Sequence, residues 1–153
     1  MSAQDLLRAE KPLVLFVDTF NGYFESDNAR AAFRVLSAAG YSIHLASKAG
    51  RNSGAGGPHL CCGRTFLSQG LVDQARKQAG ELINALLPFA QRGIPIVGLE
   101  PSCLLTLRDE ALVMGLGEAA QTVGAEAVLL EEFLAREAKS GRLLGLSTRL
   151  RPA

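Results

Sequence analysis

Several features that mark common classes of protein are absent from this sequence. There is no tryptophan among the 153 residues, aromatic residues make up only 6%, and neither sign of charge dominates, since 16 lysine and arginine residues face 15 aspartate and glutamate residues. A chain without a positive excess has no field that attracts phosphate backbones or anionic lipids. We therefore expect no nucleic-acid binding and no binding to a membrane surface.

Long hydrophobic runs are missing as well. The longest, such as LVLFV at residues 13–17, fall far short of the roughly 20 residues that a membrane-spanning helix needs. The N-terminal stretch MSAQDLLRAEKP carries both signs of charge and lacks the apolar core of a signal peptide. We therefore expect no membrane span and a cytoplasmic location, with any membrane association arising through partners.

Cysteine is scarce, and its placement is informative. Three cysteines, an odd number, argue against a disulfide framework, and grouped cysteines in a reducing compartment more often bind metal or carry out redox chemistry. Cys61 and Cys62 are adjacent within PHLCCGRTFLSQG (residues 58–70), and Cys103 follows in EPSC. The spacing lacks the C-x-x-C chelate typical of zinc sites.

The hydrophobic periodicity predicts alternating strands and helices. A buried strand at residues 13–20, a helix from Ser26 that Gly40 ends, and a strand at 41–46 make one βαβ unit with parallel strands. A glycine-rich loop is expected at 48–58, followed by one long helix from Thr65 to Ala90 that Pro88 bends. The next predicted segments are a strand at 94–100 and a helix at 101–115 that starts with proline. A short apolar run and a helix follow at 126–141. We predict an α/β three-layer sandwich with a short, mainly parallel sheet of Rossmann-like βαβ units.

Ligand sites in such sheets form at the carboxyl ends of the strands. Cys61 and Cys62 follow the second predicted strand, Cys103 follows the third, and the turn at residues 18–24 follows the first. We therefore expect the three thiols to converge on one edge of the sheet. Both cysteine positions precede or begin a helix, and the partial positive charge of a helix N-terminus is expected to lower a thiol pKa.

Three thiols in this position suit several kinds of chemistry. Iron–sulfur clusters are held by cysteine thiolates and tuned by hydrogen bonds to sulfur. Zinc is an alternative, with His59 as a fourth ligand. A thiol enzyme is another, with Cys62 or Cys103 as the nucleophile, and cysteines that are only small buried side chains are the plainest interpretation.

The segments LCCGRTFLSQGLVDQAR and IPIVGLEPSCLLTLRDE resemble the CCG cysteine-rich domain of glycolate oxidase iron–sulfur subunits, FAD-linked D-2-hydroxy-acid oxidases and the B subunit of heterodisulfide reductase. The resemblance covers about residues 12–140. It implies an electron-transfer domain that binds an iron–sulfur cluster, of the 4Fe–4S or another type, through Cys61, Cys62 and Cys103. The whole oxidoreductase would act on a 2-hydroxy acid such as glycolate or D-lactate, with FAD on another domain or subunit, and this chain would not be active alone.

The sequence departs from the pattern of that family at two positions. Thr19 stands at or near the place of the first cysteine, and Glu100 replaces the leading cysteine of a C-x-x-C. Glu100, Asp18 and His59 are therefore additional candidate ligands. The alternatives are a thiol-based redox or nucleophilic enzyme, or an interaction domain that has lost its cluster.

The resemblance also suggests a domain organisation. Residues 1–12 are expected to be an N-terminal extension, residues 13–141 one CCG-type domain, and residues 142–153 a tail that leads to a second module. The implied partners are an FAD-binding oxidase domain or subunit and a second CCG module. A homodimer is a further expectation, because an unpaired sheet edge favours association.

Overall fold

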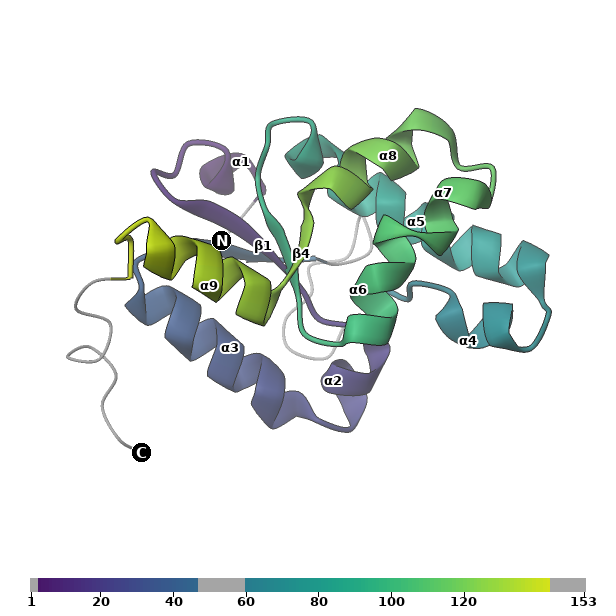
Figure 1. Ribbon diagram of the computed structural model, residues 1–153, viewed down its shortest axis with the longest axis horizontal. Helices are drawn as coiled ribbons and strands as arrows, with labels where there is room; N and C mark the ends of the chain where they lie inside the picture. The colour runs from purple at the N-terminus through teal and green to yellow at the C-terminus, as the bar shows by residue number, and fades with distance from the viewer. Residues whose placement is uncertain (1–2, 47–59, 144–153) are drawn as a thin grey trace.

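A parallel sheet of four short strands lies at the centre of the structure. The computed structural model describes residues 3–46 and 60–143. Its strands are β1 (Pro12–Phe16), β2 (Ser42–Leu45), β3 (Ile96–Gly98) and β4 (Ala127–Leu129). They are ordered β2-β1-β3-β4, and each neighbouring pair is parallel. The predicted α/β class with a short parallel sheet is thereby confirmed (Figure 1).

Helices cover both faces of this sheet. The described helices are α1 (Ala3–Leu6), α2 (Thr19–Tyr23), α3 (Ser26–Ala38), α4 (Arg64–Ser68), α5 (Val72–Ala90), α6 (Pro101–Arg108), α7 (Glu110–Val113), α8 (Gly117–Glu126) and α9 (Leu130–Lys139). Figure 1 shows α3 and α9 side by side on one face and α5, α6 and α8 on the other. The arrangement is the expected three-layer sandwich. Among the described residues, no helix is both long enough and apolar enough to cross a membrane.

The alternating side chains of β1 connect the sheet to both helical layers. Leu13 and Leu15 are fully buried in a cluster with Leu36 of α3 and Phe133 of α9. Their neighbours Val14 and Phe16 point to the opposite face, into a larger cluster that contains Leu82 and Leu86 of α5 and Leu104 of α6. A strand that is buried on both faces consists of a continuous run of apolar residues. The sequence therefore predicted β1 clearly.

The strand order creates a switch point between β1 and β3. From β1 the chain passes through α2 and α3 to β2 on one side, and it later returns to β3 on the other side. The connections therefore diverge at the carboxyl ends of β1 and β3, where doubly wound sheets bind their ligands. The helices that follow these ends, α2 and α6, have Asp18 and Glu100 as their N-caps.

Two predicted helices are each divided in the structure. The helix expected from Thr65 to Ala90 breaks into α4 and α5 around Gly70, which has a φ of +76°. The helix expected at 101–115 breaks into α6 and α7 at Asp109, where φ is −131° and ψ is −80°. The first strand ends at Phe16 rather than at residue 20, because Asp18 starts α2.

Other predicted boundaries are confirmed. Gly40 lies just beyond α3 with a φ of +87°, and Gly141 just beyond α9 with a φ of +74°. Pro101 is in the first turn of α6, and α5 continues through Pro88 to Ala90. The predicted loop at 48–58 and most of the predicted tail, from residue 144, lie outside the described residues.

Candidate functional site

Cys61 and Cys62 lie directly before α4, in a segment shaped by Gly63. This glycine precedes α4 with a φ of +85°, and a Cβ atom at its position would come 2.5 Å from the carbonyl oxygen of Ala75 in α5. The amide N–H of Gly63 donates to Cys61 Sγ at 3.4 Å, and that of Arg64 donates to Cys62 Sγ at 3.5 Å. Glycine thus lets the two-cysteine segment pack against α5 with its sulfurs facing backbone donors.

Cys103 reaches the same edge of the sheet from the carboxyl end of β3. It is the third residue of α6, whose N-cap is Glu100. Gly98 ends β3, and a Cβ atom there would come 2.6 Å from Cδ1 of Leu104. The absence of a side chain at position 98 therefore allows the first turn of α6, with Cys103, to lie close against the end of the sheet.

The three thiols form a connected series with Thr19. Thr19 interacts with Cys61, Cys61 with Cys62, and Cys62 with Cys103, closely enough to affect the pKa values of Cys61 and Cys62. All three cysteines are free, with Cys62 buried and the other two partly buried. Residues from α2, the segment before α4 and the first turn of α6 are thus brought together, and the expected convergence is observed. Thr19 touches this series from the position where the resemblance leads one to expect a cysteine.

The pKa values of Cys61 and Cys62 move in the direction opposite to the prediction. The hydrogen bond to Cys103 is the largest influence on Cys62, and together with burial it raises the pKa of Cys62 to about 11. The hydrogen bond to Cys62, followed by burial, raises the pKa of Cys61 well above the ordinary value. The expectation of lowered thiol pKa values is wrong here because adjacent thiols and burial outweigh the N-terminus of α4, which has only five residues.

The additional candidate ligands are engaged elsewhere or lie outside the described residues. Asp18 is buried, and its Oδ1 accepts from the amides of Phe20 at 2.9 Å and Asn21 at 3.0 Å, so it caps α2. Glu100 Oε1 accepts from the amide of Ser102 at 3.3 Å and from its hydroxyl at 2.8 Å. His59 is not among the described residues. Within the described ranges, no three His, Cys, Asp or Glu side chains are grouped to hold a single metal ion.

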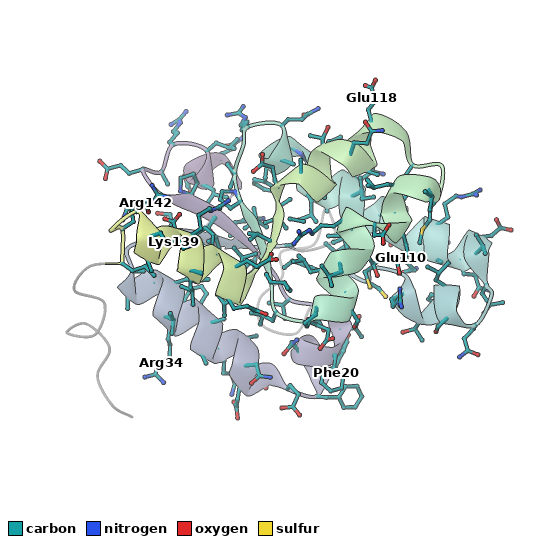
Figure 2. All side chains as sticks on the ribbon, viewed as in Figure 1. Phe20, Arg34, Glu110, Glu118, Lys139 and Arg142 are labelled. Carbon is teal, nitrogen blue, oxygen red and sulfur yellow. The ribbon has the colours of Figure 1, made fainter. Side chains whose placement is uncertain are left out.

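An ion pair beside the thiols connects α4 to α7. Arg64, at the start of α4, pairs with Glu110, the first residue of α7 (Glu110 is labelled in Figure 2). Both side chains are partly exposed, with 46% and 30% of their surface accessible. Arg64 therefore joins two helices beside the thiols. Its partner could not be identified from the sequence, because 46 residues separate the two.

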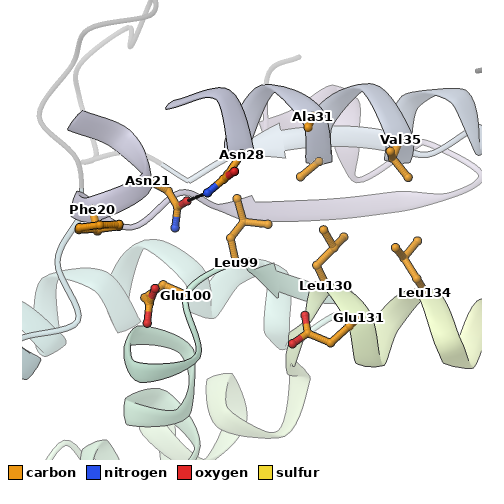
Figure 3. Close-up of a pocket in the computed structure, with 11 residues that line it drawn as sticks. Phe20, Asn21, Asn28, Ala31, Val35, Leu99, Glu100, Leu130, Glu131 and Leu134 are labelled. Carbon is orange, nitrogen blue, oxygen red and sulfur yellow. Dashed lines mark hydrogen bonds between the residues drawn. The ribbon is translucent and has the colours of Figure 1, made fainter. Parts of the chain in front are cut away.

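A groove on the other face of the sheet, at the same strand ends, was not predicted from the sequence. It has a volume of about 370 Å³ and lies between α3 and α9, with Leu99 and Glu100 from the end of β3 (Figure 3). Asn28 Nδ2 donates to Asn21 Oδ1 at 3.4 Å within its lining. The lining residues come from segments far apart in the chain, so no local sequence signal could reveal the groove.

Comparisons with known proteins give a distant match. The chain is 28% identical over 99 residues to the C subunit of the anaerobic glycerol-3-phosphate dehydrogenase of Escherichia coli strain K12, and equally to the protein of that name from Escherichia coli O157:H7. The match covers 64% of this chain but only 22% of each relative, so the chain spans a small part of their length. No protein-family model matches the chain, and no solved structure matches it significantly. The chain is thus distantly similar to part of a dehydrogenase subunit.

Proposed function

We propose that this chain is the electron-transfer module of a larger dehydrogenase, and that Cys61, Cys62 and Cys103 hold an iron–sulfur cluster. The observation that carries the proposal is the series of three interacting thiols at the switch point of the sheet. The similarity to a dehydrogenase subunit supports a redox role.

The chemistry of the donor set fits such a cluster. Iron–sulfur clusters take cysteine thiolates as ligands, usually four, and three thiols lie together here. Two of the sulfurs already accept backbone hydrogen bonds, an interaction that tunes cluster potentials. A bound cluster would supply one-electron storage. Coordination to a metal deprotonates a thiol outright, so the raised pKa values of the free thiols do not oppose binding.

The pKa values argue against the thiol-enzyme alternative at Cys61 and Cys62. A nucleophilic cysteine reacts as its thiolate, and enzymes keep the pKa of such a residue low. Neighbouring thiols, followed by burial, raise the pKa of Cys62 to about 11 and also raise the pKa of Cys61. Both side chains are therefore protonated at neutral pH in the metal-free protein.

The comparison changes the expectation for the substrate. The relatives are named for glycerol-3-phosphate, so the predicted 2-hydroxy acid is not supported. Both compounds carry an alcohol group, and we propose only that the complete enzyme oxidises an alcohol. An FAD-binding partner and a second cysteine module remain predictions from the resemblance, as does the absence of turnover by this chain alone.

Anaerobic reconstitution with ferrous iron and sulfide tests the proposal. The wild-type chain is expected to take up iron and to show the visible absorption and EPR signals of a cluster. Cys61→Ser, Cys62→Ser and Cys103→Ser should each lower the iron content severalfold. Val113→Ser is the matched control, because Val113 is 85% exposed on α7. A wild-type chain that takes up no iron, or three serine variants that retain it, would contradict the proposal.

A further inference from the structure

Arg64 stands at a position that the stability of its own helix does not explain. It is the first residue of α4, and a cation at a helix N-terminus meets the positive end of the helix dipole. Its ion pair with Glu110 is partly exposed on both sides, and pairs of that kind add little to stability. A role of this pair at the neighbouring thiols therefore explains it better than a role in the fold.

The ion pair is attached to the thiol site through the backbone. The amide N–H of Arg64 donates to Cys62 Sγ at 3.5 Å, so the residue that carries the guanidinium contacts one of the proposed ligands. Helix α4 also packs against α6, which carries Cys103. Glu110 follows α6 at the start of α7 and pairs with the guanidinium from that side. One positive and one negative charge therefore lie at the edge of the thiol site.

Charges beside a cluster act on electron transfer, because a cluster gains one negative charge when it accepts one electron. Net charge is among the properties that set the reduction potential of an iron–sulfur cluster. A nearby cation favours the reduced form, and a nearby carboxylate favours the oxidised form. Both side chains of this pair are partly buried, so solvent screens them less than it screens freely exposed charges. In the intact pair the two effects oppose each other.

We infer that the Arg64–Glu110 pair sets the reduction potential of the cluster, with Glu110 offsetting the positive charge that Arg64 places beside Cys62. Neither residue is a ligand, and each acts through its charge. The inference rests on the proposed cluster. It predicts that two substitutions that break the same ion pair move the potential in opposite directions. A pair that only braced α4 against α7 would give shifts of one sign, or none, because either substitution breaks the same contact.

Redox titration of the reconstituted full chain, followed by EPR and with dithionite as the electron donor, tests this inference. Arg64→Gln should lower the midpoint potential and Glu110→Gln should raise it, each by about 30 mV, which corresponds to about a threefold change in the ratio of reduced to oxidised cluster. The double variant should stay close to the wild type, as should Arg64→Lys, which retains the positive charge. Raising the salt from about 0.1 M to about 1 M should reduce both shifts, because the Debye length falls from about 10 Å to about 3 Å.

Lys139→Gln and Glu118→Gln are the matched controls, because one removes a positive and the other a negative charge from an exposed side chain. Both residues lie away from Glu110 in Figure 2, and neither substitution should change the potential. Shifts of the same sign from Arg64→Gln and Glu110→Gln, no shift from either, or equal shifts from the controls would overturn this inference and leave the cluster proposal standing. A wild-type chain that takes up no iron would overturn both.

Discussion

At the scale of single residues, Thr19 lies where a fourth cysteine would complete the ligand set of the proposed cluster. Its side chain interacts with Cys61, the first of the three thiols in the series. A threonine hydroxyl is a poor ligand for iron in a cluster, whereas a thiolate is a good one. Position 19 is therefore suitably placed for a ligand, but its threonine side chain is a poor ligand for iron.

Thr19→Cys is expected to increase the retention of iron. The new thiol would stand beside Cys61 and complete a set of four cysteines, so the reconstituted variant should lose iron to a chelator several times more slowly than the wild type. Iron release followed by absorbance measures this rate. Gln121→Cys adds a cysteine on the exposed side of α8, away from the site, and should have no effect. Equal release from the wild type and Thr19→Cys would show that position 19 does not reach the cluster.

The raised pKa of Cys62 gives a second prediction at this scale. A thiol with a pKa of about 11 holds about 100-fold less thiolate at pH 7 than one with a pKa of 9. In the metal-free protein, alkylation of Cys62 by iodoacetamide should therefore be slow at pH 7 and should accelerate as the pH rises towards 11. Mass spectrometry after timed quenching gives the rate. The exposed cysteine of Gln121→Cys is the internal reference, and equal rates at both residues would contradict the assignment.

At the scale of secondary-structure elements, close backbone approach determines where the cysteines lie. Gly63 lets the segment before α4 touch α5, and Gly98 lets α6 touch the end of β3. These contacts explain which features the sequence revealed. Strand ends and helix starts are local signals, so the convergence of Cys61, Cys62 and Cys103 was predictable. The pKa directions of Cys61 and Cys62 depend on neighbours in space, and the prediction for these two residues was wrong.

The divided helices have a similar explanation. The apolar spacing continues across Gly70 and Asp109, so periodicity alone predicted uninterrupted helices. Helix α8 was missed because its buried side chains, such as Ala120 and Val123, are few and small. Tertiary contacts between α5 and α8, which supply the packing energy, cannot be read from a local pattern.

Gly63→Ala should destabilise the fold and disturb the site. Alanine would have to adopt a φ of +85° and place its Cβ 2.5 Å from the carbonyl oxygen of Ala75, so we expect a loss of about 2–4 kcal/mol in the free energy of unfolding. Gly70→Ala is the matched control, because its φ is +76° but no atom lies within 4 Å. That variant should lose only about 1 kcal/mol. Urea unfolding measures both values, and similar losses would refute the steric argument.

At the scale of the whole molecule, a buried carboxylate joins the first and last parts of the described chain. Glu137, near the end of α9, accepts hydrogen bonds from the Tyr41 hydroxyl and from Arg142, whose Nε and Nη2 lie 2.5 Å from its two oxygens. The bonds from Arg142, followed by the bond from Tyr41, lower the pKa of Glu137 to about 2 against the opposing effect of burial. Burial and Glu137 raise the pKa of Tyr41 to about 12.

This cluster predicts a loss of stability in acid. Because the pKa of Glu137 is lower in the folded state than its usual 4.5, its contribution is fully present above pH 4.5 and is lost as the pH falls towards about 2. Glu137→Gln should lower the free energy of unfolding at pH 7 by about 1–3 kcal/mol. The expected loss is smaller than for a fully buried ion pair, because solvent screens the half-exposed Arg142. Its stability should also change less between pH 5 and pH 2.5.

Urea unfolding at several pH values checks this prediction, with Glu118→Gln as a control on an exposed glutamate. If the wild type and Glu137→Gln lose the same stability between pH 5 and pH 2.5, other carboxyl groups govern the acid transition. Iron uptake by Glu137→Gln at pH 7 should equal that of the wild type, because Tyr41 lies at the amino end of β2 and the thiols lie at the carboxyl ends of the strands.

The placement of Glu137 and the thiols at opposite ends of the sheet has an evolutionary consequence. Among the described residues, no hydrogen bond or ion pair joins Glu137, Tyr41 or Arg142 to the three thiols. A single substitution at the thiol edge, such as Thr19→Cys, is therefore expected to leave the fold intact. Sequence changes at that edge can accumulate in evolution while the architecture persists.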